Sequence, residues 1–207
     1  MKKAELRKSS LATIGILFMA LLLLGSCNKK EAPSAPANLK AVLMNNDCIH
    51  LSWKRVPRAD YYRITVGFQT RDSNNVLADI YEVFLCETSD LIYNDFYPFD
   101  GMNYYKIEAV NEYGSSPYSE VSCYYANYAN TGGVALYPNP TKGNVTIEAA
   151  GMRRIILTDL LGNVCFEWEG NADNCVLNVS QSNPGIYLLQ IYSDDGYNVK
   201  RFVYRVE

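Results

Sequence analysis

The stretch that decides the fold class is residues 62–68, which read YRITVGF. Its apolar members Tyr62, Ile64, Val66 and Phe68 alternate with polar or small residues. In an extended chain successive side chains point to opposite faces, so strict alternation over a short run is typical of a half-buried β-strand. The stretch therefore predicts an antiparallel strand with one face in a hydrophobic core.

Two further segments repeat this alternation, Ile49–Trp53 before the stretch and Tyr105–Ala109 after it. Short alternating runs separated by turn residues predict a β-sandwich. No segment beyond the first apolar run shows the 3.6-residue period of an amphipathic helix. We therefore expect an all-β protein.

The order of residues between positions 36 and 119 resembles the fibronectin type III family. The matching positions are Pro36–Ala41, Ile49–Trp53, Val56, Ala59–Ile64, Ala109–Gly114, Ser116 and Ser119. The resemblance implies a fibronectin type III-like sandwich over residues 38–125, with Trp53 between its two sheets. Asn103 stands where the family usually has a tyrosine, so the resemblance implies that its tyrosine corner is missing or shifted here.

A second β-rich block follows a small, polar, glycine-ending linker at residues 126–133. Short strand-like runs occupy residues 134–207, and turn residues such as Asn183-Pro184-Gly185 separate them. We expect a second, small β-sandwich in tandem with the first.

This second block resembles the type A C-terminal sorting domain of cargo of the type IX secretion system. The resemblance rests on Leu136–Gly143, Asp159–Val164, Pro184–Leu189 and Val199–Val203. It implies a sorting motif made of Pro138, Asn139, Pro140, Gly143, Asp159, Gly162, Gly185, Tyr187 and Lys200. It also implies that type IX machinery is a partner, and that the domain directs passage across the outer membrane and can be cleaved there.

The N-terminal segment predicts export. A basic start, Met1–Lys8, precedes the apolar run Leu11–Leu24, which is too short for the roughly 20 residues of a membrane span. Leu24–Cys27 resembles the lipobox of bacterial lipoproteins, of the kind found in the Bacteroidetes. The resemblance implies that residues 1–26 are a signal peptide, that Cys27 carries a lipid, and that residues 27–37 are a tether.

The lipoprotein signal and the sorting domain together imply an exported outer-membrane lipoprotein. Its lipid would attach it to the membrane, at the cell surface or on the periplasmic face. The two signals sit awkwardly together, because cargo with this sorting domain usually carries a non-lipoprotein signal. Two alternatives follow. The chain is a lipidated cargo, or the second domain no longer sorts and serves as a structural sandwich.

Six cysteines raise the question of disulfides. If Cys27 carries a lipid, five remain, and an odd number leaves at least one thiol unpaired within the molecule. A hairpin centred on Gly170 would place Cys165 opposite Cys175, within reach of a disulfide. The alternative is two unbridged, half-buried thiols. The sequence assigns no pairing to Cys48, Cys86 and Cys123.

Composition argues against several function classes. The net charge is −3, which disfavours nucleic-acid binding, because phosphate contacts supply most of that affinity. The basic pair Lys200-Arg201 and the loop carboxylates Asp95 and Asp100 are expected to be solvated or turn-forming. His50 is the single histidine and lies out of phase with the apolar row of its strand. We expect no enzyme, no metal and no cofactor.

The candidate binding surface is aromatic. The chain has 17 tyrosines, and by strand phase Tyr61, Tyr104 and Tyr124 are expected to face outward. The loop at residues 94–101 adds Phe96, Tyr97 and Phe99. The alternatives are cross-strand aromatic packing on a solvated face and, for the loop, a plug at one end of the sandwich.

The favoured function is a non-catalytic envelope or cell-surface lipoprotein whose first domain adheres to an unknown protein or glycan ligand. One alternative is an accessory module of a polysaccharide-degrading system, or a cryptic hydrolase. Another is a structural spacer or a subunit of a surface fibre.

Overall fold

The computed structural model describes residues 30–45, 48–71, 77–125 and 133–205. The secondary structure in these ranges consists of the strands β1 to β13, and no helix there is long and apolar enough to cross a membrane. The predicted signal peptide, the predicted lipid site Cys27 and most of the predicted linker lie outside the described residues. The all-β prediction is confirmed.

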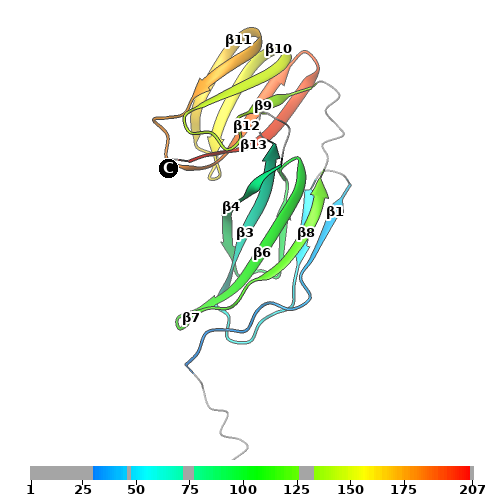
Figure 1. Cartoon of the computed structure of the whole chain (residues 1–207), viewed down its shortest axis with the longest axis vertical. Helices are drawn as coiled ribbons and strands as arrows, with labels where there is room; N and C mark the ends of the chain where they lie inside the picture. Colours follow the sequence, from blue (N-terminus) through cyan, green and yellow to red (C-terminus); the bar gives the residue numbers. More distant parts are fainter. Residues whose placement is uncertain (1–29, 46–47, 72–76, 126–132, 206–207) are drawn as a thin grey trace, which may run out of the picture. The chain divides into compact units, whose positions relative to one another are not determined.

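The first sandwich consists of two antiparallel sheets (Figure 1). One sheet has the order β1-β2-β5, with bounds Lys40–Met44, Cys48–Ser52 and Ile92–Asp95. The other has the order β4-β3-β6, with bounds Leu77–Thr88, Tyr61–Arg71 and Gly101–Asn111. Two further strands, β7 (Gly114–Ser115) and β8 (Ser119–Tyr125), pair with β6.

Both sheets contribute to one core, as the alternation predicts. The apolar row of β3, from Tyr62 to Phe68, is buried together with Ile49 and Leu51 of β2. Trp53 is 6% exposed, and its ring meets that of Tyr62 edge to face, with the centroids 5.4 Å apart. Such aromatic pairs stabilise a core beyond the area that they bury.

Asn103, at the position where the related family has a tyrosine, closes the loop between β5 and β6. Its side chain is fully buried. Its Oδ1 accepts from the Phe99 N–H at 2.9 Å, and its Nδ2 donates to the carbonyls of Phe99 (2.8 Å) and Gly101 (3.2 Å). The tyrosine two positions later, Tyr105, points into the core and donates its hydroxyl proton to Asp95.

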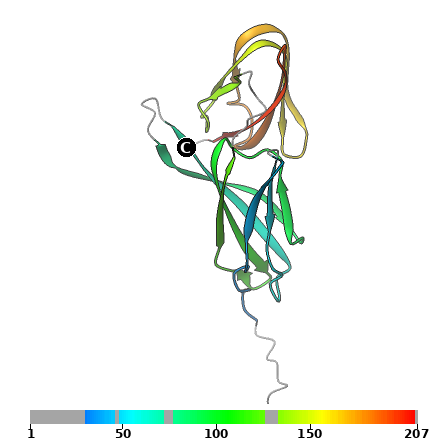
Figure 2. The same cartoon turned by 90° about the vertical axis from the view of Figure 1, so that its right-hand side faces the viewer.

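The second sandwich is built from one bent sheet, shown from the side in Figure 2. Its order is β11-β10-β12-β13, with bounds Val164–Asn178, Asn144–Asp159, Gly185–Ser193 and Gly196–Tyr204. β9 (Ala135–Tyr137) pairs with the first half of β10, whereas β12 pairs with its second half. Register shifts between these halves let β10 bend around a core that includes Ile147, Ile155 and Phe202.

The predicted hairpin around Gly170 is wrong. β11 continues through this residue, so Cys165 and Cys175 lie on the same strand, ten positions apart, and both are free thiols. At about 3.3 Å per residue their separation is far beyond the 4.4–6.8 Å between Cα atoms that a disulfide needs. The turn residues around Gly170 form an irregular stretch of the ladder, where Met152 pairs with Ala172 and Arg154 with Glu169.

Candidate ligand-binding groove

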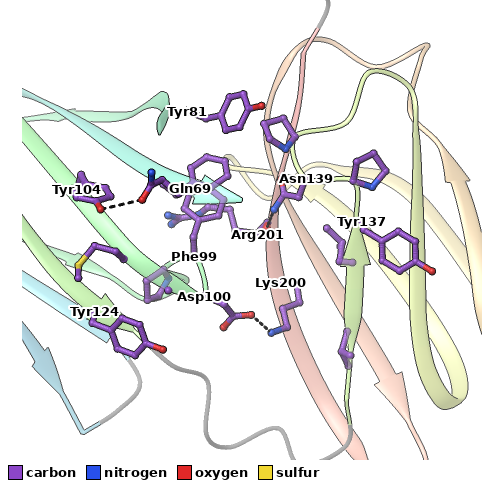
Figure 3. Close-up of a pocket in the computed structure, with 18 residues that line it drawn as sticks. Gln69, Tyr81, Phe99, Asp100, Tyr104, Tyr124, Tyr137, Asn139, Lys200 and Arg201 are labelled. Atoms are coloured by element: carbon purple, nitrogen blue, oxygen red, sulfur yellow. Dashed lines mark hydrogen bonds and ion pairs between the residues drawn. The ribbon is translucent and has the colours of Figure 1, made fainter. Parts of the chain in front are cut away.

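A groove of about 810 Å³ lies where the end of the first sandwich meets residues 134–140 and 200–201 (Figure 3). This volume falls within the range of small-molecule sites in proteins. The first sandwich lines it with the ends of β3, β4, β6 and β8 and with the loop before β6. The second lines it with β9, the following loop and β13.

Aromatic side chains form the wall contributed by the first sandwich. Phe99 is buried and stacks on Phe68, with the ring centroids 3.7 Å apart. Tyr104 is half-buried, and its hydroxyl donates to Gln69 Oε1 at 3.3 Å. Tyr124 on β8 is 58% exposed and pairs in register with Met102. This wall therefore combines a fixed aromatic base with one accessible tyrosine ring.

The opposite wall is the loop Pro138-Asn139-Pro140. Two hydrogen bonds of Asn139 hold this loop against β13. Asn139 donates its Nδ2 proton to the Arg201 carbonyl at 3.2 Å and accepts from the Val203 N–H at 3.0 Å. Tyr137 also lines the groove, but its ring points away in Figure 3 and its hydroxyl donates to Glu148. That hydrogen bond raises the pKa of Tyr137.

A buried ion pair forms the floor of the groove. Arg201 donates from Nη2 to Asp95 Oδ1 at 2.6 Å and from Nη1 to Asp95 Oδ2 at 3.1 Å. The Arg201 side chain is 3% exposed, and that of Asp95 is 0% exposed. The Arg201 guanidinium also lies 5.2 Å from the centroid of the Phe99 ring, a cation–π contact.

Tyr105 completes the surroundings of Asp95. Its hydroxyl donates to Asp95 Oδ2 at 2.8 Å. Burial raises the pKa of Tyr105 strongly, and the charge of Asp95 raises it further. The raised pKa favours the protonated phenol, which is the form that donates to the carboxylate.

A second ion pair lies nearer the solvent. Lys200 donates from Nζ to Asp100 Oδ2 at 2.7 Å, and the Asp100 side chain is 56% exposed. Among the described residues, the charged side chains that line the groove are Asp100, Lys200 and Arg201, and each has an ion-pair partner. The described part of the groove lining therefore presents aromatic and polar groups, and its charged side chains are paired.

The structure places the six aromatic candidates in different surroundings. Phe99, Tyr104 and Tyr124 line the groove. Phe96 and Tyr97 are exposed on the preceding loop, outside the groove. Tyr61 lies half-buried on β3, where Arg63 donates to its hydroxyl. Phe99 is only 5% exposed, which fits the alternative that its loop plugs one end of the sandwich.

The residues of the implied sorting motif divide into two groups. Pro138, Asn139, Pro140 and Lys200 line the groove. The others lie at strand ends, in turns or in the second core and are Gly143, Asp159, Gly162, Gly185 and Tyr187.

Two members of the second group have clear structural roles. Asp159 accepts hydrogen bonds from the backbone N–H groups of Leu161 and Asn163, both at 2.9 Å. Gly162, in the same turn, has a φ of 86°, a value that favours glycine. Together they shape the turn between β10 and β11.

The floor of the groove differs from the expectation for its charged residues. Arg201 and Asp95 were expected to be solvated or turn-forming, yet both are buried and paired with each other. The partners lie 106 positions apart, so no local pattern indicates the pair. The one sequence signal is the strand phase of β13, where Arg201 adjoins the buried Phe202 and Val203.

A metal centre was not expected, and the chain within the described ranges contains no group of three His, Cys, Asp or Glu residues able to hold a metal ion. His50 lies on β2 and shares a 2.7 Å hydrogen bond with Asn94 on β5.

Comparison with known proteins identifies the second sandwich. Residues 135–205 match the family described as "Secretion system C-terminal sorting domain". The chain therefore carries a type IX sorting tail, which implies export, contact with the type IX machinery and association with the cell surface or outer membrane. A search of curated proteins finds no match.

The similar solved structures include fibronectin type III domains. "Structure of FN3tt mut" is 22% identical and aligns with 44% of this chain and 94% of its own, with a TM-score of 0.34. "Crystal Structure of FN3tt" is 22% identical, with 45% and 95% aligned and the same TM-score. "Titin kinase and its flanking domains" is 9% identical, with 79% and 30% aligned and a TM-score of 0.37.

Proposed function

We propose that this exported chain is a non-catalytic envelope protein that holds a protein or glycan ligand in the groove described above. The observation that carries the proposal is the groove itself, which has an accessible tyrosine ring, a buried aromatic base and a volume suited to a ligand. Rigid tyrosines with a polar tip are favoured in binding surfaces, because they offer a large contact area at a low entropic cost.

The charge arrangement supports binding rather than turnover. A general acid or base must be free to exchange a proton with the substrate. The ionisable side chains of the groove include Asp100, Lys200 and Arg201, and each of these three has an ion-pair partner. His50 does not line the groove. These features favour a site that recognises its ligand without converting it.

The sorting domain directs export of the chain to the cell envelope. We propose that a lipid on Cys27 also attaches the chain to the membrane. Under this proposal the chain is a lipidated cargo of the type IX system. Metabolic labelling with palmitate tests the lipid directly. The native chain should take up label and a Cys27→Ser variant should not, and an unlabelled native chain would contradict the anchor.

Binding is tested with the exported chain immobilised and exposed to envelope fractions and extracellular-matrix preparations. We expect saturable binding of a polymer that Tyr124→Ala weakens, because this change removes the accessible ring from the groove. Tyr118→Ala is the matched control, because Tyr118 is 52% exposed and lies outside the groove. Saturable binding that both variants retain in full would place the ligand elsewhere.

A further inference from the structure

We propose that the ligand of the groove is an uncharged oligosaccharide and that the sorting domain supplies one wall of its binding site. This inference rests on the proposed function and specifies its ligand class. Three observations carry it: the pairing of the groove's charges, the exposed aromatic ring, and the origin of the second wall.

The first step concerns charge. Lys200 is bound to Asp100 at 2.7 Å and Arg201 to Asp95 at 2.6 Å, so each of the two cations in the described lining has its own carboxylate. An anionic ligand would have to displace one of these carboxylates, and a cationic ligand would have to displace Lys200 or Arg201. Because an ion pair that loses its partner in a partly buried site is costly, the groove favours a neutral ligand.

The second step concerns the surface that remains. Tyr124 presents a largely exposed ring, and Met102 and Tyr104 lie beside it in the groove lining. Pyranose rings have apolar C–H faces and a polar rim of hydroxyl groups. An aromatic face bordered by hydroxyl, amide and ion-paired groups matches both parts of such a ring.

The third step concerns the alternative ligand, an extended peptide. A peptide that binds by strand addition needs an open sheet edge. At the groove, β3 lies between β4 and β6, and β6 lies between β3 and β8. The backbone of β13 is occupied as well, because Val203 donates its N–H to Asn139 and accepts from the Thr141 N–H at 2.8 Å. β3, β6 and β13 therefore offer side chains rather than free backbone edges, whereas β4, β8 and β9 each pair on one side only among the described strands, so the peptides in the experiment test this alternative directly.

The fourth step concerns the second wall. Leu136, Pro138, Asn139 and Pro140 line the groove, and all four belong to the matched sorting domain. The buried Asp95–Arg201 pair joins this domain to the first sandwich directly beneath the groove. The site is therefore complete only when both sandwiches are present and docked.

The experiment uses the exported chain on an array of neutral, uronic-acid and sulfated oligosaccharides, together with unstructured peptides of similar length. Affinities for the positive compounds are then measured by calorimetry. We expect neutral oligosaccharides to bind more tightly than the charged ones. Tyr124→Ala should weaken that binding by about tenfold, because it removes the aromatic ring on which the sugar stacks.

Variants on the second wall test the contribution of the sorting domain. Pro138→Ala removes an exposed ring from this wall and should weaken the same binding by roughly fivefold. The matched control is Pro184→Ala, an exposed proline of the sorting domain outside the groove, which should leave the affinity unchanged. Full binding by Pro138→Ala would overturn the shared wall while leaving the proposed function intact.

The other outcomes are also decisive. Tighter binding of uronic-acid or sulfated chains, or binding of peptides alone, would overturn the ligand class and leave the proposed function standing. Failure of every sugar and peptide to bind in a manner sensitive to Tyr124→Ala would overturn this inference. The proposed function would fall as well if the envelope and matrix preparations also showed no saturable binding that Tyr124→Ala weakens.

Discussion

Asp95 of β5 and Arg201 of β13 form a doubly hydrogen-bonded ion pair between the two sandwiches, and neither side chain is more than 3% exposed. Tyr105 donates a third hydrogen bond to the carboxylate, and the guanidinium faces the ring of Phe99. Arg201 keeps its Nε–H buried without a hydrogen-bond partner, but each charge of the pair is neutralised by the other, whereas a single buried charge is strongly unfavourable. The pair therefore favours one docked arrangement over any that separates its members.

The first prediction is that Arg201→Met lowers the free energy of unfolding by about 3–5 kcal/mol, because it leaves Asp95 buried without its cation. The double variant Asp95→Asn with Arg201→Met should recover much of this loss, since neither charge is then present. Urea denaturation of the three proteins measures both effects. A single variant as stable as the native chain would show that the pair is not buried in solution.

Lys200→Met is the control for this experiment. Its partner Asp100 is 56% exposed, and exposed ion pairs contribute about 1 kcal/mol or less. We expect a small change in stability for this variant. An effect as large as that of Arg201→Met would mean that position 200 tolerates no substitution for reasons unrelated to burial of charge.

The second prediction concerns Asn103, whose amide holds the loop before β6 in place. Asn103→Ala leaves the buried N–H and C=O groups of Phe99 without their partner, at a cost of about 1–3 kcal/mol for each unsatisfied group. Thermal denaturation should show a clear fall in Tm. Asn94→Ala, which removes an exposed side chain that hydrogen bonds to His50, should change Tm little.

The third prediction concerns the thiols. Cys165 is exposed and should react quickly with a maleimide, whereas burial raises the pKa of Cys86 to about 11 and should slow its reaction at neutral pH. Because Cys165 and Cys175 are ten positions apart on one strand, mild oxidation should not link them within one molecule. Peptide mapping by mass spectrometry measures both, and an intramolecular Cys165–Cys175 peptide would contradict the continuous strand.

These cases show how far sequence reasoning extends. The row from Tyr62 to Phe68 predicts its own burial, because alternation is a local property of an extended chain. The groove's aromatic wall was partly predictable for the same reason, since strand phase places Tyr124 outward and Tyr125 inward. Features that depend on one strand and its immediate phase can therefore be predicted from the residues.

Features that depend on partners far away in the sequence could not be predicted from the residues. Arg201 is a charged residue on a strand near the end of the chain, and such residues are usually exposed. Its burial depends on Asp95, which lies in another sandwich. The hairpin predicted around Gly170 is wrong for a different reason. Its neighbours favour a turn, but β10 and β11 pair on both sides of an irregular stretch there, so β11 continues. Tertiary pairing, not local preference, decides both outcomes.

The last prediction is a pH dependence that arises in the turn after β10. The side chain of Asn163 hydrogen bonds to Asp159, and the backbone N–H groups of Asn163 and Leu161 add to it; these bonds lower the pKa of Asp159 below its ordinary value. A lowered pKa in the folded state means that the ionised carboxylate stabilises the fold. This contribution is complete above the pKa of the unfolded chain, about 3.9, and is lost as the pH falls through the lower folded value.

Asp159→Asn should therefore lower Tm by a constant amount at neutral pH, and the difference from the native chain should shrink below about pH 4 as the native carboxyl is protonated. Thermal denaturation from pH 7 to pH 3 measures this difference. Asp195→Asn, an exposed change in the turn between β12 and β13, corrects for the general loss of a negative charge. A difference that stays constant down to pH 3 would show that the Asp159 turn does not depend on the ionised carboxylate.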